Sequence, residues 1–210
     1  MKRCVILGGG DIICYESAAA RLVPDDFIIC ADSGYHHCAP LDITPDLLVG
    51  DFDSIGKMPD GVEILRYRTD KDYTDTGLAA EYALEHRFES ILLLGMTGGG
   101  RIEHTLANLQ TAAHCAAFCE VSLYDGRSNI TVIRANSPTS RKLQPLDEHY
   151  FSLLAFSELC RDVTITGGKY PLNSYNLRYD EARAVSNEFC GQPVTISFES
   201  GTLLVVVTPK

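Results

Sequence analysis

The chain has 210 residues, 45% of them hydrophobic and 22% charged, which predicts a globular protein of one large domain or two small ones. Its formal net charge is −10, and its 18 lysines and arginines form no dense block, which excludes a general nucleic-acid binder because such a protein needs a positive field. The apolar runs are far shorter than the roughly 20 residues of a transmembrane helix, so no membrane span is expected.

Eight cysteines are spread along the chain without a C-x-x-C pair. Cys115 and Cys119 are one helical turn apart next to His114, but zinc normally needs four ligands at recognisable spacing. The even count permits disulfides. Asp11 and Glu16 end the first apolar run, which argues against a signal peptide. Reduced thiols and a cytoplasmic location are therefore expected.

The first half of the chain alternates short apolar runs with helical patterns, which is the order that builds a parallel sheet covered by helices. Strands are expected at 3–9, 27–34, 46–54, 61–67, 90–95 and 121–126. Helices are expected at 15–22, 75–88 and 101–118, with Thr74 or Asp75 as the N-cap of the second. The pattern favours a Rossmann-like, mostly parallel α/β domain.

Asn, Ser, Pro and Thr cluster at residues 136–140, and the pattern changes there. Short β-rich runs follow at 150–156, 161–168, 184–189, 193–200 and 202–208, separated by Gly, Pro and Asn turns. Such runs are typical of an antiparallel sandwich or barrel. The sequence therefore predicts an α/β domain over residues 1–134 and a smaller all-β sandwich domain over residues 135–210.

Four polar clusters follow predicted strands, and they are the segments 8–11, 31–34, 50–54 and 95–101. In an open parallel sheet, ligands bind beside the carboxyl ends of the strands. Each cluster alone is weak support for a site, whereas four at equivalent positions predict one at this edge.

Asp51 and Asp53 flank Phe52 at the end of an apolar run. Residues two apart on a strand point to the same side, so the two carboxylates would repel each other unless a cation lies between them. Mg²⁺ prefers such oxygen ligands and usually keeps a phosphate as a further ligand. A capped turn is the alternative, because Asp and Ser are common turn formers.

Lys71, Asp72 and Asp75 precede the predicted helix at 75–88. Acidic residues at a helix N-terminus are favoured by the helix dipole, so ordinary capping would also explain them. Three carboxylates at 70, 72 and 75 together with a lysine at a sheet edge are otherwise typical of a magnesium–polyphosphate site.

The segment 97–108, TGGGRIEHTLAN, joins a glycine-rich turn to a helix, where backbone N–H groups hold anions. Arg101, His104 or Thr105, and Asn108 recur at helical spacing, so they would line one face. His104 and Asn108 would equally suit a solvent-facing surface. Neither the P-loop pattern nor the dinucleotide fingerprint occurs in the chain.

Taken together, these motifs resemble the thiamine pyrophosphokinase family, in order and in spacing. The resemblance is carried by ADSG, LLVGDFDSI, DKDYTDTGLAAEYAL, LLGMTGGGRIEHTLANL and AVSNEF, and it covers nearly the whole chain. It implies transfer of the pyrophosphoryl group of ATP to the thiamine hydroxyl, which gives thiamine diphosphate and AMP. It further implies Mg²⁺ as cofactor and a homodimer with active sites between subunits.

The resemblance also implies roles for individual residues. The magnesium ligands are Asp51, Asp53 and Asp75. The ATP-binding residues are Asp32, Ser33, Lys71, Arg101 and His104. The thiamine-binding residues are Asp75, Ser186 and Asn187. The residues expected to take part in catalysis are Asp51, Asp53, Asp72, Asp75 and Arg101, with Asp72 or Asp53 orienting or deprotonating the thiamine hydroxyl.

The chain departs from the family pattern at two places: Glu103 replaces the usual Asp, and an extra glycine lengthens the turn at 98–100. The chain has no Trp, so an aromatic that stacks on thiamine must be Tyr or Phe, with Tyr170 and Tyr175 as candidates. Two alternatives stay open: a diphosphokinase for another hydroxymethyl heterocycle such as a pterin, and a non-catalytic nucleotide- or metal-binding relative.

Overall fold

The computed structural model describes residues 2–50, 61–65 and 74–210. Its contacts divide the chain into two compact units, Met1–Arg127 and Ser128–Lys210, here called the N-terminal and C-terminal units. The predicted division between residues 134 and 135 falls inside strand β7, Asn129–Ala135.

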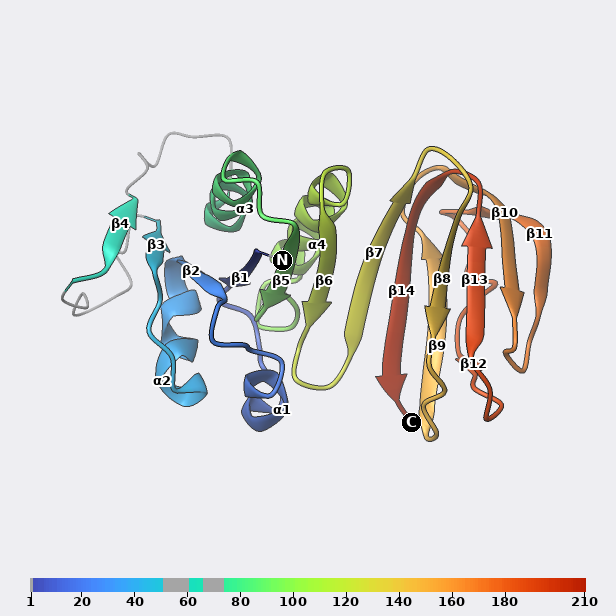
Figure 1. The fold of residues 1–210 in the computed structure, drawn as a ribbon, viewed down its shortest axis with the longest axis horizontal. Helices are drawn as coiled ribbons and strands as arrows, with labels where there is room; N and C mark the ends of the chain where they lie inside the picture. Colours follow the sequence, from blue (N-terminus) through green and yellow to red (C-terminus); the bar gives the residue numbers. More distant parts are fainter. Residues whose placement is uncertain (1, 51–60, 66–73) are drawn as a thin grey trace. The chain divides into compact units, whose positions relative to one another are not determined.

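The N-terminal unit is built on a parallel sheet in the order β6-β5-β1-β2-β3-β4 (Figure 1). The strands are β1 Arg3–Leu7, β2 Phe27–Ala31, β3 Leu47–Val49, β4 Glu63–Leu65, β5 Ser90–Leu94 and β6 Glu120–Tyr124. The inner strands are buried at nearly every position, because helices cover both faces of such a sheet. This agrees with the predicted Rossmann-like α/β class.

Helices connect these strands. They are α1 Tyr15–Ala19, the 3₁₀ helix η1 Asp32–His37, α2 Cys38–Leu41, α3 Asp75–Glu85 and α4 Ile102–Cys115. One core cluster joins Val5, Leu7 and Leu92 of the sheet to Ala18 of α1 and Leu41 of α2. The α3 helix packs on β1, β2 and β3, and α4 packs on β6.

The segment 27–34 was predicted as one strand, and this prediction is wrong at its end. Strand β2 stops at Ala31, and η1 begins at Asp32. Asp32 has a φ of 43°, in the left-handed region, so the extended conformation cannot continue through it. The chain therefore turns away from the sheet at this aspartate.

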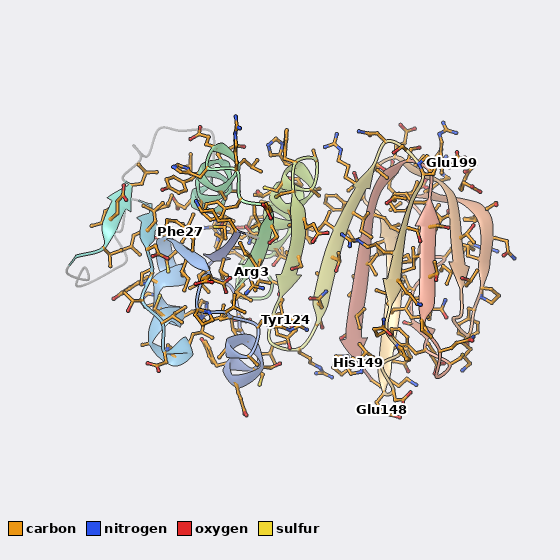
Figure 2. All side chains as sticks on the ribbon, in the orientation of Figure 1. Arg3, Phe27, Tyr124, Glu148, His149 and Glu199 are labelled. Carbon is orange, nitrogen blue, oxygen red and sulfur yellow. The ribbon has the colours of Figure 1, made fainter. Side chains whose placement is uncertain are left out.

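A partly buried ion pair joins two segments of the N-terminal unit. Arg3 Nε and Nη2 donate to the Asp26 carboxylate at 2.7 Å and 2.6 Å, and Nη2 also donates to the Arg21 carbonyl (Figure 2 labels Arg3). The link fixes the turn before β2 to the start of β1, and breaking it would leave the buried Asp26 carboxylate uncompensated.

The C-terminal unit contains two antiparallel sets of strands, in the orders β12-β9-β14-β7 and β11-β10-β13-β8. Besides β7, the strands are β8 Thr139–Leu143, β9 His149–Ala155, β10 Leu159–Thr166, β11 Leu172–Arg178, β12 Asn187–Glu188, β13 Val194–Phe198 and β14 Gly201–Pro209. Phe151 and Leu203 from one set pack with Val163 and Ile196 from the other in a single core. This is the predicted sandwich.

The C-terminal unit differs from the expectation at several strands. Strands β7 and β8, on either side of residues 136–140, were not predicted. Strand β11 was not predicted, because its sequence LNSYNLR is mostly polar and most of its positions are exposed. The predicted strand at 184–189 shrinks to the two residues of β12. Among the residues that the structure describes, no helix is long and apolar enough to cross a membrane.

Candidate active site

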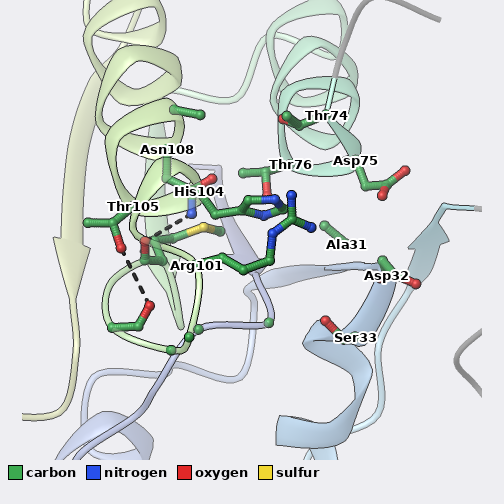
Figure 3. A pocket seen from close by; sticks show the side chains of 17 residues that line it. Ala31, Asp32, Ser33, Thr74, Asp75, Thr76, Arg101, His104, Thr105 and Asn108 are labelled. Carbon is green, nitrogen blue, oxygen red and sulfur yellow. Dashed lines mark hydrogen bonds between the residues drawn. The ribbon is translucent and has the colours of Figure 1, made fainter.

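The carboxyl ends of β1, β2 and β5 and the first turns of α3 and α4 surround a cavity of about 360 Å³ (Figure 3). Three of the four predicted polar clusters contribute to it, through Gly9, Gly10, Asp32, Ser33 and the turn 98–101. The fourth cluster, at 50–54, lies largely outside the described residues. The cavity is thus at the sheet edge where the sequence places a ligand site.

Two glycine-rich loops form one wall of the cavity, and hydrogen bonds join them. The N–H of Gly10 donates to the Gly95 carbonyl at 2.7 Å, and that of Asp11 donates to the Thr97 carbonyl at 2.8 Å. In return, the Asp11 carboxylate accepts the N–H of Gly99 at 2.7 Å. These bonds extend the β1–β5 pairing beyond the sheet and hold the turn at 98–100 in place.

Glycine is required at this wall for steric reasons. A Cβ at Gly10 would lie 2.5 Å from the Thr97 carbonyl oxygen, and Gly98 and Gly99 both have a φ of 73°. The wall therefore presents backbone rather than side chains, and backbone of this kind can approach a phosphate group closely.

Asp32 and Ser33 lie at the end of β2 and line the same cavity. Asp32 is the first residue of η1, directly after the buried strand β2, and has a left-handed φ of 43°. Backbone strain of this kind is concentrated at functional sites. The structure therefore brings both residues of the predicted ATP-binding turn to the cavity.

Asp75 opens α3 and also lines the cavity. The residue before it, Thr74, is the N-cap: its Oγ1 accepts the N–H of Gly77 at 3.1 Å. Asp75 therefore lies at the positive end of the helix dipole and contributes to the lining of the cavity. Of the two predicted N-caps, Thr74 is the one observed.

Arg101 is the N-cap residue of α4, and its Nε donates to Glu103 Oε1 at 2.7 Å. This ion pair lowers the pKa of the Glu103 carboxyl. Figure 3 shows the side chains of Arg101 and His104 extending from α4 across the cavity. The cavity thus combines a guanidinium and an imidazole with the carboxylates of Asp32 and Asp75.

Asn108 lies one turn further along α4, and its amide is buried rather than exposed to solvent. Its Nδ2 donates to the Met96 carbonyl at 2.9 Å. Thr105 Oγ1 donates to the Gly98 carbonyl at 3.5 Å. These two bonds attach the turn after β5 to α4, so this face of the helix both supports the cavity and lines it.

His37 is a supporting residue that the sequence analysis did not identify. It is buried beneath the first glycine loop, where its Nε2 donates to the Gly10 carbonyl at 2.9 Å and its Nδ1 accepts from the Tyr15 hydroxyl at 2.7 Å. Burial lowers the pKa of His37, which keeps the imidazole neutral and suits this pair of bonds. The segment YHH carries no pattern that would have revealed the role.

Four of the predicted site residues, Asp51, Asp53, Lys71 and Asp72, lie outside the described residues. Their roles stay predictions. Within the ranges 2–50, 61–65 and 74–210, no group of three or more His, Cys, Asp or Glu side chains is arranged to hold a metal ion.

The C-terminal unit has a cavity of its own, of about 290 Å³, lined by Tyr170, Arg183, Val185 and Asn187 among others. Ser186 is exposed and has a φ of 58°, and its N–H donates to Ser152 Oγ at 2.9 Å. Asn187 is buried beside it. Both predicted residues thus lie at or next to a cavity.

Comparison with known proteins shows two matches to domain families. Residues 20–123 match the family described as "Thiamin pyrophosphokinase, catalytic domain", and residues 139–203 match "Thiamin pyrophosphokinase, vitamin B1 binding domain". A curated thiamine pyrophosphokinase of Bacillus subtilis is 31% identical over 98% of this chain and 98% of its own length.

Solved structures give the same result. A thiamine pyrophosphokinase from Bacillus subtilis superimposes with a TM-score of 0.88 at 27% identity, and each chain is fully covered. One from Geobacillus thermodenitrificans superimposes with a TM-score of 0.83 at 25% identity, covering 100% of this chain and 98% of that one.

Proposed function

The chain belongs to the thiamin pyrophosphokinase family, and on that premise we propose that it transfers the pyrophosphoryl group of ATP to the thiamine hydroxyl, giving thiamine diphosphate and AMP. The observation that carries the proposal is the match of both the catalytic and the vitamin B1 binding families to one chain. An enzyme specific for a pterin would not be expected to contain a vitamin B1 binding domain.

The cavity of the N-terminal unit supports ATP binding. Transfer of a phosphoryl or pyrophosphoryl group needs mainly alignment of the reactants and neutralisation of charge. The backbone wall at 98–100 suits the polyphosphate, and the Arg101 guanidinium stabilises the negative charge that develops as the α–β bond breaks. His104 lies near Arg101 on α4 and adds a further hydrogen-bonding group to the lining of the cavity.

We assign a divalent cation, Mg²⁺, to Asp51, Asp53 and Asp75. The carboxylates of Asp75 and Asp32 line one cavity, and carboxylate oxygens are the ligands that a hard cation prefers. When bound, the cation supplies charge neutralisation for the polyphosphate. Lys71 would add a second positive charge, and Asp72 or Asp53 would orient the thiamine hydroxyl or accept its proton.

Thiamine is assigned to the cavity of the C-terminal unit, at Ser186 and Asn187, with Asp75 completing its site. The second match, to a vitamin B1 binding domain over residues 139–203, supports this assignment because that range includes the residues that line the cavity.

A homodimer with active sites between subunits is proposed together with the thiamine site. Support comes from Ile102 and Leu106 on one face of α4, which are 69% and 57% exposed.

We also propose a cytoplasmic location. All eight cysteines are free thiols, and the Sγ atoms of Cys30 and Cys38, at 3.3 Å, are in non-covalent contact. Reduced thiols at this separation suit a reducing compartment.

The experiment that tests the function is AMP release from ATP and Mg²⁺ with thiamine or 6-hydroxymethyl pterin as the acceptor. Release with thiamine, together with formation of thiamine diphosphate, is the expected result. Release with the pterin alone would identify the enzyme as a diphosphokinase for another heterocycle. Absence of AMP with every acceptor would instead support a non-catalytic nucleotide-binding protein.

A further inference from the structure

Three consecutive glycines, Gly98, Gly99 and Gly100, lie in the turn between β5 and α4 and line the cavity of the N-terminal unit. Gly98 and Gly99 both have a φ of 73°. Glycine loses more conformational freedom on folding than any other residue, so three in succession adopt many conformations unless neighbouring segments hold them. The contacts of this turn therefore decide whether the cavity wall has a single shape.

The bonds from α4 hold only the beginning of the turn. They end on the carbonyls of Met96 and Gly98, and the second of them is long, at 3.5 Å. The middle of the turn is held from the other side, where Asp11 Oδ2 accepts the N–H of Gly99 at 2.7 Å. This length is typical of a charge-assisted hydrogen bond, which is stronger than a bond between neutral groups.

Asp11 is itself anchored. Its N–H donates to the Thr97 carbonyl at 2.8 Å, and the carbonyl of the preceding Gly10 accepts Nε2 of the buried His37 at 2.9 Å. The side chain packs directly on the turn, since a Cβ on Gly98 would lie 2.5 Å from Asp11 Oδ2. The carboxylate is thus presented to the turn from a backbone with little freedom to move.

Asp11 supports the cavity wall without forming part of its surface. Among the residues that the structure describes, Gly10 and the three glycines of the turn line the cavity, whereas Asp11 does not. Direct contact with a polyphosphate would also be unfavourable, because the two negative charges repel each other. Any contribution of Asp11 to ATP binding must therefore act through the turn.

We infer that Asp11 is a positioning residue for ATP, whose carboxylate holds the glycine turn, through the Gly99 N–H, in the conformation that accepts the polyphosphate. The inference rests on the proposed function, which assigns ATP to this cavity. A turn that is in its binding conformation for only part of the time binds more weakly by that fraction. The extra glycine that lengthens this turn relative to the family pattern increases the need for such a bond.

The bond and the charge of Asp11 affect ATP in opposite directions, so substitutions separate them. Asp11→Ala removes both, and it is expected to raise the KM for ATP about three- to tenfold with the KM for thiamine unchanged. Asp11→Asn removes the charge but keeps a carbonyl oxygen for the Gly99 N–H, so its KM for ATP should equal the wild-type value or fall below it. A residue that acted through charge alone would give a lower KM for ATP in both variants.

Asp46→Ala is the matched control. Asp46 is exposed like Asp11, and its Oδ2 accepts the N–H of Ile28 at 2.8 Å. This bond lies at the amino ends of β2 and β3, and Asp46 lines neither of the two cavities described above. Loss of one such bond should lower the melting temperature by a similar amount in both alanine variants, whereas only Asp11→Ala should weaken ATP binding.

Two measurements do not depend on turnover. Calorimetric titration with ATP and Mg²⁺, in the absence of thiamine, gives a Kd for ATP that should rise in Asp11→Ala by the same factor as the KM. Hydrogen exchange followed by mass spectrometry should show faster deuterium uptake in a peptide covering residues 97–101 of Asp11→Ala than in the wild type or Asp46→Ala, because the Gly99 N–H loses its acceptor.

An unchanged or lower Kd for ATP in Asp11→Ala would overturn the inference, and so would equal deuterium uptake in the three proteins. An equal rise in the KM for ATP in Asp46→Ala would overturn it as well, since the effect would then be a general loss of stability. A wild type that binds ATP but forms no AMP with thiamine would mean that the proposed function has failed, and the Kd values would still decide the role of Asp11. A wild type that forms AMP, with Asp11→Ala unaffected, would mean that only the inference has failed.

Discussion

Single residues of the cavity divide into those that face it and those that hold other groups in place. Arg101 and Asp75 line it, whereas Asn108 and His37 each form a hydrogen bond to a backbone carbonyl of the loops that build its wall. Mutation of the first kind should change turnover with little change in folding, and mutation of the second kind should change stability.

Arg101→Ala is expected to lower kcat for AMP formation by about 10² to 10³, because it removes a positive charge from the lining of the proposed ATP cavity. The melting temperature should hardly change, since the ion pair with Glu103 is exposed. Steady-state kinetics with ATP and thiamine measure the effect. Arg178→Ala is the matched control: Arg178 pairs with Asp180, also two residues along the chain, and lines neither cavity.

Near-normal turnover of the Arg101 variant would show that the guanidinium has no part in the transfer. Equal loss of activity in both variants would point instead to a general effect of removing surface charge. Only a loss confined to Arg101→Ala supports its assigned role.

His37 gives a pH-dependent prediction. Burial lowers its pKa in the folded protein, so the unfolded chain takes up a proton at a higher pH than the folded one. The resulting contribution to stability is fully present above the unfolded pKa of about 6.5, and it is lost as the pH falls below that value. The free energy of unfolding of the wild type should therefore fall between pH 7 and pH 5 more steeply than that of His37→Gln.

Urea denaturation at several pH values measures the difference, and the two curves should converge as the pH decreases. Parallel curves for the two proteins would show that His37 titrates alike in the folded and unfolded states, which would contradict its burial as the cause.

At the scale of elements, the site depends on the two glycine loops that continue the β1–β5 pairing. Gly10→Ala would place a Cβ 2.5 Å from one carbonyl oxygen and 2.7 Å from another. Overpacking of this kind costs about 1–3 kcal/mol, equivalent to a fall in melting temperature of several degrees for a chain of this length.

Gly100→Ala is the matched control for that experiment. Gly100 is in the same wall, but a Cβ there meets no atom within 4 Å and its φ is not positive, so its melting temperature should stay close to that of the wild type. Calorimetry of both variants measures the difference. Equal melting temperatures would mean that the loops move apart easily and do not form a fixed wall.

The elements that sequence patterns predicted well are those whose signal is local. Apolar runs predicted the buried strands β1 and β5, and the helical pattern predicted α3 with Thr74 or Asp75 as its cap, of which Thr74 is observed. Strand β11 was missed because an exposed edge strand needs no apolar alternation. The end of β2 was misplaced because an apolar run does not reveal the left-handed φ of 43° with which Asp32 ends the strand.

The same distinction applies to the site. Asp32 and Arg101 lie in polar segments that follow predicted strands, and Asp75 begins a predicted helix, so sequence patterns could place all three at one edge of the sheet, while their roles stay predictions. His37 and the contacts of Asn187 could not be found, since both depend on hydrogen bonds between segments far apart in the sequence. Sequence spacing can place a residue near a site, but it does not reveal the hydrogen-bond partners of its polar atoms.

At the scale of the whole molecule, the two cavities belong to different units, each with its own core. ATP is assigned to one and thiamine to the other, so a complete active site needs one cavity of each kind. In the proposed homodimer, the catalytic unit of one subunit works with the sandwich unit of its partner. Active sites shared between subunits predict that activity is recovered in mixed dimers of two variants, whereas sites within one subunit predict no recovery.

Arg101→Ala and Tyr170→Ala alter the two different cavities, and each should be less active than the wild type at low thiamine. When they are mixed and allowed to exchange subunits, their activity should rise above the mean of the two separate variants. In a mixed dimer with shared sites, one site carries both substitutions and the other carries neither. Because random exchange makes half of the dimers mixed, the recovered activity should approach roughly a quarter of the wild-type value. Sites contained within one subunit would each keep one substitution, and the mixture would stay as inactive as its components. Sedimentation of the mixture confirms that dimers are present, so a failure to recover activity in dimers would exclude shared active sites.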